Sequence, residues 1–92
     1  MGTRPTPTGW QHYVDVAMSK APEPRFTDPM RALSDIEGGL VQPLVEVIDQ
    51  RADGSVVVRV SVFSSVAAAS PSELASINGV VAELRYADAD GV

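Results

Sequence analysis

The residues best suited to chemistry in this sequence are the single histidine, His12, and an aspartate three positions later, Asp15. On a helix the carboxylate could hydrogen-bond to the imidazole, which is half of a general-base arrangement. A nucleophile would have to come from elsewhere, and the candidates are Ser64, Ser65 and Ser70. None of these serines lies in a Gly-x-Ser-x-Gly motif. We therefore interpret His12 as a surface or cap residue and assign no catalytic residue.

Metal and cofactor sites are not expected either. The chain has no Cys and one His, which excludes thiolate and multi-histidine metal sites. Asp88 and Asp90 resemble the opening of a calcium loop, but the further ligands of such a loop do not follow. Asp35 and Glu37 are two positions apart on a predicted helix and do not face each other. The glycines are isolated and do not form a phosphate-binding loop.

The charge balance disfavours two classes of partner. The formal net charge is −5, and the seven basic residues form no cluster. Nucleic acids and anionic membranes both require a basic surface, so we expect neither as a partner. The N-terminal segment lacks the apolar core of a signal peptide, and no apolar run approaches the ~20 residues of a membrane span. We expect a soluble protein that is made in the cytoplasm.

The strongest local signal is Asp53-Gly54 between two strand-like runs at 43–64, which predicts a β-hairpin. A loop at 51–54 predicts the pairs Val45–Val60, Glu46–Arg59, Val47–Val58 and Ile48–Val57. The core face is then formed by Val45, Val47, Val56, Val58, Val60 and Val62. The other face is mixed, with Val57, Arg59, Ser61 and Phe63, and we expect a helix or a partner to cover part of it.

The N-terminal half predicts an extended arm and two helices. Prolines at alternate positions in 1–8 favour extended backbone. Apolar residues in 9–20 follow a helical spacing, although alternation at His12, Val14, Val16 and Met18 leaves a strand as the alternative. A stiff connector at 21–25 follows. The segment 28–37 is a second predicted helix, with Asp28 as its cap and Gly38-Gly39 at its end.

The C-terminal half is ambiguous after its first turn. Ser70-Pro71-Ser72-Glu73 is a capping-box sequence, so a helix should begin at Pro71. Asn78-Gly79 is a strong breaker, and the residues after it alternate. We predict a short helix at 71–77 and a strand at 80–86. A continuous helix remains the alternative, because Leu74, Ile77, Val81 and Leu84 form a helical stripe.

These elements predict a small α+β fold in one domain. Two N-terminal helices precede a central antiparallel hairpin, and a short helix and a C-terminal strand follow it. The domain spans 9–86, between an extended Pro/Thr arm at 1–8 and an acidic tail at 87–92. A chain of 92 residues has a thin core, so oligomerisation or docking into a larger complex is a reasonable source of further stability.

The leading hypothesis for function is a non-catalytic structural or adaptor subunit of a larger protein assembly. A bacteriophage virion component of the decoration or head–tail connector type fits this profile. A regulatory or accessory module of an enzyme or toxin is the second hypothesis, and a small oligomeric enzyme that uses His12 is the third. The partner is expected to be another copy or a different protein chain. The candidate contact residues are Pro5, Pro7, Trp10, Tyr13 and Phe63.

Overall fold

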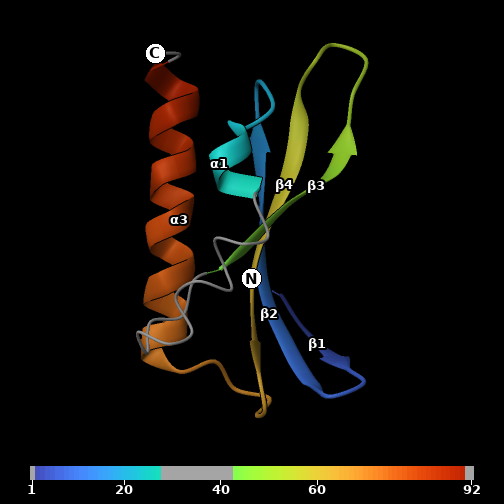
Figure 1. Ribbon diagram of the computed structural model, residues 1–92, viewed down its shortest axis with the longest axis vertical. Helices are drawn as coiled ribbons and strands as arrows, with labels where there is room; N and C mark the ends of the chain where they lie inside the picture. Colours follow the sequence, from blue (N-terminus) through green and yellow to red (C-terminus); the bar gives the residue numbers. More distant parts are fainter. Residues whose placement is uncertain (1, 28–42, 91–92) are drawn as a thin grey trace.

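The computed structural model describes residues 2–27 and 43–90, which form one antiparallel sheet and two helices (Figure 1). The four strands lie in the order β1-β2-β4-β3. In chain order the elements are β1 (Gly2–Thr6), β2 (Gly9–Met18), α1 (Pro24–Thr27), β3 (Leu44–Gln50), β4 (Val56–Ser64) and α3 (Pro71–Asp90).

The helix predicted at 9–20 is wrong, because this segment contains strand β2. Along β2 the side chains of His12, Val16 and Met18 are buried, whereas Asp15 between them is exposed. This alternation is the two-residue period of a strand, which the sequence offered as the alternative. β2 pairs with β4 from Trp10 to Met18, and this pairing outweighs the local helical spacing.

Residues 2–6 form strand β1, which pairs with β2 of the same chain. The two-residue turn Pro7-Thr8 joins the strands. The primed types of hairpin turn need a positive φ at a central residue, and neither Pro7 nor Thr8 has one, so this turn is not of a primed type. Gly9 follows the turn, where a Cβ would lie 2.4 Å from the carbonyl oxygen of Ser64. Pro5 is tolerated because β1 is an edge strand, and its missing N–H discourages pairing with a further strand.

The predicted hairpin is confirmed in its central register. The confirmed pairs are Val45–Val60, Glu46–Arg59 and Val47–Val58. The predicted pair of Ile48 with Val57 is wrong, because a β-bulge between Val47 and Asp49 places Asp49 opposite Val57. The expected core face is confirmed for the alternate valines of β4, all of which are buried.

The hairpin loop has the turn chemistry that Asp-Gly predicts. Gly54 has a φ of 92°, and its N–H donates to the carbonyl oxygen of Arg51 at 3.1 Å. The carboxylate of Asp53 accepts hydrogen bonds from the backbone N–H of Ser55 at 2.9 Å and from its hydroxyl at 2.6 Å.

The short helix at 71–77 and the strand at 80–86 are wrong as predicted, because α3 is one continuous helix. Its predicted start is confirmed. The backbone N–H of Ser70 donates to the Glu73 carboxylate at 2.8 Å, and the N–H of Glu73 donates to the Ser70 hydroxyl at 3.2 Å. These two reciprocal bonds are a capping box.

α3 continues through Gly79 because its apolar stripe packs on the sheet. Ile77, Val80 and Leu84 are buried at helical spacing. Burying each of these side chains is worth about 1.5–3 kcal/mol, whereas a glycine inside a helix costs about 1 kcal/mol. The helix therefore also includes much of the expected acidic tail at 87–92, as far as Asp90.

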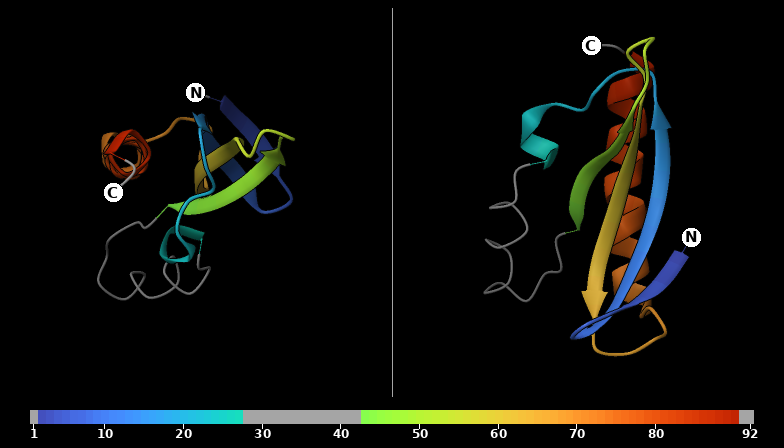
Figure 2. Two further views of the ribbon diagram at one scale, coloured as in Figure 1. Left: turned by 90° about the horizontal axis from the view of Figure 1, so that it is seen from above. Right: turned by 90° about the vertical axis from the view of Figure 1, so that its right-hand side faces the viewer.

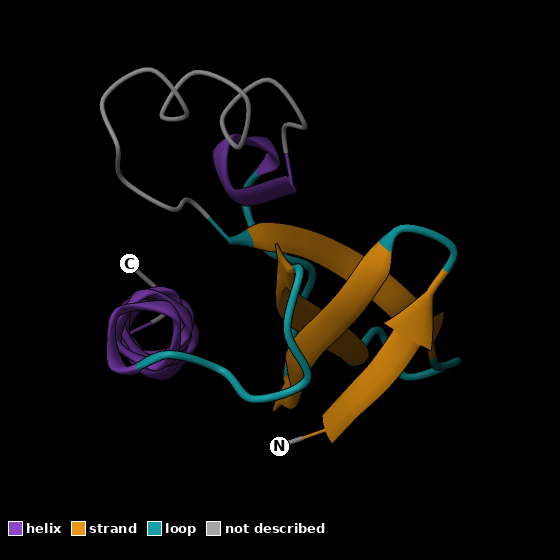
Figure 3. Cartoon of the chain, turned by 90° about the horizontal axis from the view of Figure 1, so that it is seen from below, coloured by secondary structure: helices purple, strands orange, loops and turns teal. Residues whose placement is uncertain are grey.

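Both helices lie on the same side of the sheet (Figures 2 and 3). α3 packs against β4 and β2, and α1 packs against β3 and brings Phe26 into the core. The fold is therefore a four-stranded antiparallel sheet with a C-terminal helix, and the expected pair of N-terminal helices is wrong. α1 forms in the predicted connector region, while the helix predicted at 28–37 lies outside the described residues.

Candidate functional site

His12 and Asp15 lie on opposite faces of β2, so the pair predicted from helical spacing does not form. The His12 side chain is fully buried on the face that packs against the helices. Its Nδ1 lies 3.2 Å from the hydroxyl oxygen of Thr3, and its Nε2 has no hydrogen-bond partner in the described chain. The imidazole therefore has neither the orienting aspartate nor the solvent access that a general base needs.

The three serines considered as nucleophiles do not hydrogen-bond to His12 within the described residues. The Ser64 hydroxyl accepts a hydrogen bond from the backbone N–H of Val66 at 3.2 Å, and the Ser70 hydroxyl caps α3. Ser65 is exposed in the connection between β4 and α3. The arrangement that nucleophilic catalysis requires is not assembled around this histidine.

The paired carboxylates are not brought together either. Asp88 accepts hydrogen bonds from the backbone N–H of Ser19 at 3.0 Å and from its hydroxyl at 2.7 Å, which ties α3 to the end of β2. Asp35 and Glu37 lie outside the described residues. Within the residues that the structure describes, no group of three or more His, Asp or Glu could hold a metal ion.

The sheet face that points away from the helices carries the second set of side chains, and we call it the open face. Neither described helix covers it, because both pack on the valine-rich face (Figure 2). The strand register places on it Gly2, Arg4 and Thr6 of β1, Gly9, Gln11, Tyr13, Asp15 and Ala17 of β2, Val57, Arg59, Ser61 and Phe63 of β4, and Leu44, Glu46 and Asp49 of β3.

A bidentate ion pair lies in the middle of the open face. Arg59 donates from Nε to one oxygen of Asp15 at 2.8 Å and from Nη2 to the other at 3.1 Å. Its guanidinium carbon also lies 4.1 Å from the centre of the Tyr13 ring. The hydrogen bond between the two side chains lowers the pKa of Asp15 and raises the pKa of Arg59. Both charges are therefore held at defined positions on this surface.

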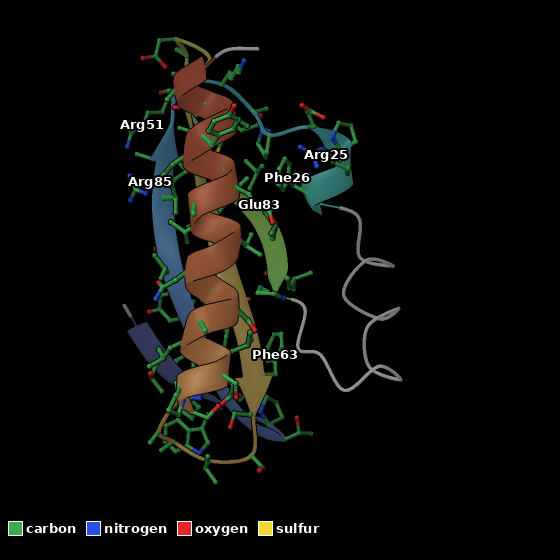
Figure 4. The ribbon with its side chains drawn as sticks, turned by 90° about the vertical axis from the view of Figure 1, so that its left-hand side faces the viewer. Arg25, Phe26, Arg51, Phe63, Glu83 and Arg85 are labelled. Atoms are coloured by element: carbon green, nitrogen blue, oxygen red, sulfur yellow. The ribbon has the colours of Figure 1, made fainter. Side chains whose placement is uncertain are left out.

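An exposed aromatic ring lies on the same face, further along β4 than Arg59 and Ser61. Phe63, near the end of β4, is 58% exposed (Figure 4). Gln11 lies opposite it on β2 and is buried, with its side-chain oxygen accepting a hydrogen bond from Nε of Arg4. The neighbouring ring of Tyr13 lies over Gly2, where a Cβ would be 2.3 Å from the ring. The open face thus combines a projecting ring with a flat polar surface.

Ser61 lies between Tyr13 and Leu44 in the register of the open face. Its side chain is fully buried, yet its hydroxyl oxygen has no hydrogen-bond partner in the described chain. A buried hydroxyl without a partner costs about 1–3 kcal/mol. The centre of the open face therefore contains one small polar group whose hydrogen-bonding capacity is unused.

The five predicted contact residues fall into two groups. Tyr13 and Phe63 share the open face as diagonal neighbours on adjacent strands. Pro5 and Trp10 are opposite each other on the other face, at the end of the sheet where Pro7 forms the turn. Trp10 is half-buried there. Of the predicted residues, Tyr13 and Phe63 are the pair that contributes to one exposed surface.

The sequence patterns did not indicate that Arg4 and Asp15 contribute to this surface. The signal that could have found them was the strand alternative for 9–20, because it places Gln11, Tyr13 and Asp15 on one face. Arg59 was expected to pair with Glu46, and the register does place these residues opposite each other. The hydrogen bonds of Arg59 go instead to its other cross-strand neighbour, Asp15.

A separate groove with a volume of about 540 Å³ lies between the α1 segment and α3 (Figure 4). Tyr86 on its rim is 73% exposed. Arg25 in its wall forms an ion pair with Glu23 at 3.1 Å and lies over the ring of Phe26 at 4.3 Å. The groove is lined by Glu23, Arg25, Ala82, Glu83, Tyr86 and Ala87. Its charged walls contain neither a nucleophile beside a base nor a set of metal ligands.

The fold and this surface define a two-layer α+β protein whose sheet is covered on one face by the described helices. Comparisons with protein-family models, with curated proteins and with solved structures gave no match. In the described part of the chain, no helix has both the length and the apolar character needed to cross a membrane.

Proposed function

We propose that this protein is a non-catalytic structural or adaptor subunit that binds other protein chains through the open face of its sheet. The observation that carries this proposal is the exposure of Phe63, a large aromatic side chain near the end of β4 and opposite Gln11 of β2. Tyr13 and Leu44 are half-buried on the same face, and Arg59 lies beside them. Aromatic residues and arginine are enriched at protein interfaces.

The sheet edges support docking on the face rather than addition of a strand. β1 carries Pro5, which cannot donate to a further strand. β3 carries the bulge at Ile48 and the acidic residues Glu46 and Asp49. Bulges and charges on edge strands oppose pairing with another chain. An accessory module, the second hypothesis, could bind by adding a partner's strand to the hairpin edge, and these features of the edge disfavour that mode of binding.

The proposal stops at the class of assembly subunit. The described residues carry no feature that is specific to a virion component or to a regulator of a toxin or enzyme. The open face accounts for a protein partner without either of these narrower assignments.

Replacing Phe63 tests the proposal. Tagged wild-type protein and Phe63→Ser are used to recover binding chains from the native host cells, and each co-purified chain is quantified. Because truncating an aromatic side chain that anchors an interface costs about 2 kcal/mol, we expect recovery to fall at least ten-fold. The substituted side chain is already largely exposed, so the fold should be retained.

Tyr86→Ser is the matched control, because Tyr86 is an exposed aromatic residue on the helix layer. It should leave recovery unchanged, and circular dichroism should show the same folded spectrum for all three proteins. Equal recovery with Phe63→Ser and wild type, or equal losses with both variants, would contradict a binding role for the open face.

A further inference from the structure

We propose that the occupant of the open face is a second copy of this chain, packed face to face about a two-fold axis. The axis runs parallel to the strands, between β2 and β4. This inference rests on the proposed function and deepens it by naming the partner. The observations that support it are the charges and the sizes of the side chains that β2 and β4 place on the open face.

The two-fold axis determines which residues meet. It places β2 of one copy over β4 of the other. Because the axis is parallel to the strands, the two residues of each cross-strand pair keep the same position along the strands in both copies. Pairs that are neighbours within one sheet therefore also face each other between the two sheets. They are Asp15 with Arg59, Tyr13 with Ser61, Gln11 with Phe63 and Ala17 with Val57.

The charges of the two copies are complementary in this arrangement. Asp15 of each copy faces Arg59 of the other, so the signs alternate around a group of four charges. Within the described chain, Arg59 bonds to Asp15 through Nε and Nη2, which leaves the donors of Nη1 for a second carboxylate. The open face carries Arg4, Asp15, Glu46, Asp49 and Arg59, whose charges sum to −1, so little of the net charge of −5 per chain lies at the contact. The facing pairs of Asp15 and Arg59 favour this alignment over others.

The sizes of the side chains are complementary as well. The projecting ring of Phe63 faces the position of Gln11, whose side chain is buried in its own chain and accepts a hydrogen bond from Arg4. The ring of Tyr13 faces the position of Ser61, whose side chain is fully buried in its own chain and therefore does not project toward the other copy. Each large residue thus faces one that is buried in its own chain, which allows two sheets to approach to about 10 Å.

The size of the face sets the expected strength. Four strands about 4.8 Å apart, with roughly 3.3 Å per residue along the longest strands, give a face of about 19 by 30 Å. An interface of this size lies near the lower end of the range for specific protein complexes. We therefore expect a dimer that dissociates in the micromolar range rather than an obligate one.

Sedimentation velocity of the purified full chain from about 1 to 500 µM measures this equilibrium. The wild type should pass from monomer to dimer, and Phe63→Ser should weaken the dimer at least ten-fold. Arg85→Asp is the matched control for charge, because Arg85 is an exposed arginine on the helix layer (Figure 4). It should dimerise as the wild type does.

Charge exchange then tests the alignment. In a dimer of Arg59→Asp, two carboxylates of one chain would face two carboxylates of the other. In a dimer of Asp15→Arg, two guanidinium groups would face two guanidinium groups. Because like charges repel, each variant alone should be monomeric. Mixed in equal amounts they should form a heterodimer, because two carboxylates of one chain then face two guanidinium groups of the other. A purely structural role for the intrachain pair predicts no recovery on mixing. Phe63→Ser leaves the pair intact, so it tests the same face if a charge variant does not fold.

The outcomes separate this inference from the proposed function. A wild type that stays monomeric up to 500 µM overturns the second copy as the occupant. A dimer that persists in all of the open-face variants also overturns it. The same holds if Arg59→Asp and Asp15→Arg form no heterodimer when they are mixed. If a monomeric wild type still binds a different chain, and Phe63→Ser abolishes that binding, the inference fails while the proposed function stands. If neither self-association nor another partner depends on Phe63, both fail.

Discussion

Single residues of the open face link the stability of the protein to pH. The hydrogen bond from Arg59 lowers the pKa of Asp15 from its usual value of 3.8. As the pH falls, the Asp15 carboxylate of the unfolded chain is therefore protonated before that of the folded chain. The pair therefore stabilises the folded state at neutral pH, and this stabilisation is lost as the pH falls through 3.8 and then through the folded pKa. Because the Asp15 side chain is 38% exposed, solvent screening keeps the effect modest.

We expect the melting temperature of the wild type to fall more steeply between about pH 5 and pH 2 than that of Asp15→Asn. Thermal denaturation at a series of pH values measures the difference. Asp53, whose pKa is lowered by hydrogen bonds from Ser55, is common to both proteins and cancels in the comparison. An Asp15 carboxyl that titrates at its ordinary pKa in carbon-detected NMR would rule out this linkage.

At the scale of elements, Gly79 tests the continuity of α3. It is exposed in the helix interior, and an added Cβ would have no heavy atom within 4 Å. Gly79→Ala should therefore stabilise the protein by about 0.5–1 kcal/mol, from helix propensity and a less flexible unfolded chain. Urea denaturation measures the change.

Ala75→Gly is the matched control, because Ala75 is also exposed in α3. It should destabilise the protein by a similar amount. A helix that ended at Ile77, as the sequence predicted, would need Gly79 as a breaker, and Gly79→Ala would then be destabilising. The sign of the Gly79 effect therefore decides between the two structures.

β2 shows why one element was predicted wrongly. Helical spacing and strand alternation coexist in the same ten residues, and local propensity separates them by little. The strand is decided by pairing with β4 on one side and β1 on the other. Because that pairing involves residues about 50 positions away, no local pattern could settle the choice.

At the scale of the whole molecule, self-association makes thermal stability depend on concentration. A dimer that forms from folded chains stabilises them by mass action, so the melting temperature of the wild type should rise with protein concentration. For Phe63→Ser the melting temperature should depend less on concentration and should begin to rise only at a concentration at least ten-fold higher. Scanning calorimetry from about 10 to 500 µM measures both curves. A wild-type melting temperature that is constant over this range would argue against association of the native chains.

The sequence by itself determined the features that depend on neighbours in the chain. The hairpin loop, the central register of β3 and β4, the buried valines and the capping box of α3 follow from turn chemistry, alternation and hydrogen bonds over a few residues. Phe63 and Tyr13 were also expected as contact residues, although without a surface that joins them.

The tertiary structure decided the features that depend on distant segments. It made β2 a strand, which separated His12 from Asp15 and brought Asp15 to Arg59 from 44 positions away. It extended α3 through Gly79, because burying a stripe of apolar side chains outweighs the cost of one glycine. It also placed both described helices on one side of the sheet, which leaves the other face uncovered by them. Pairing and packing over long separations set these outcomes, and local sequence patterns do not record them.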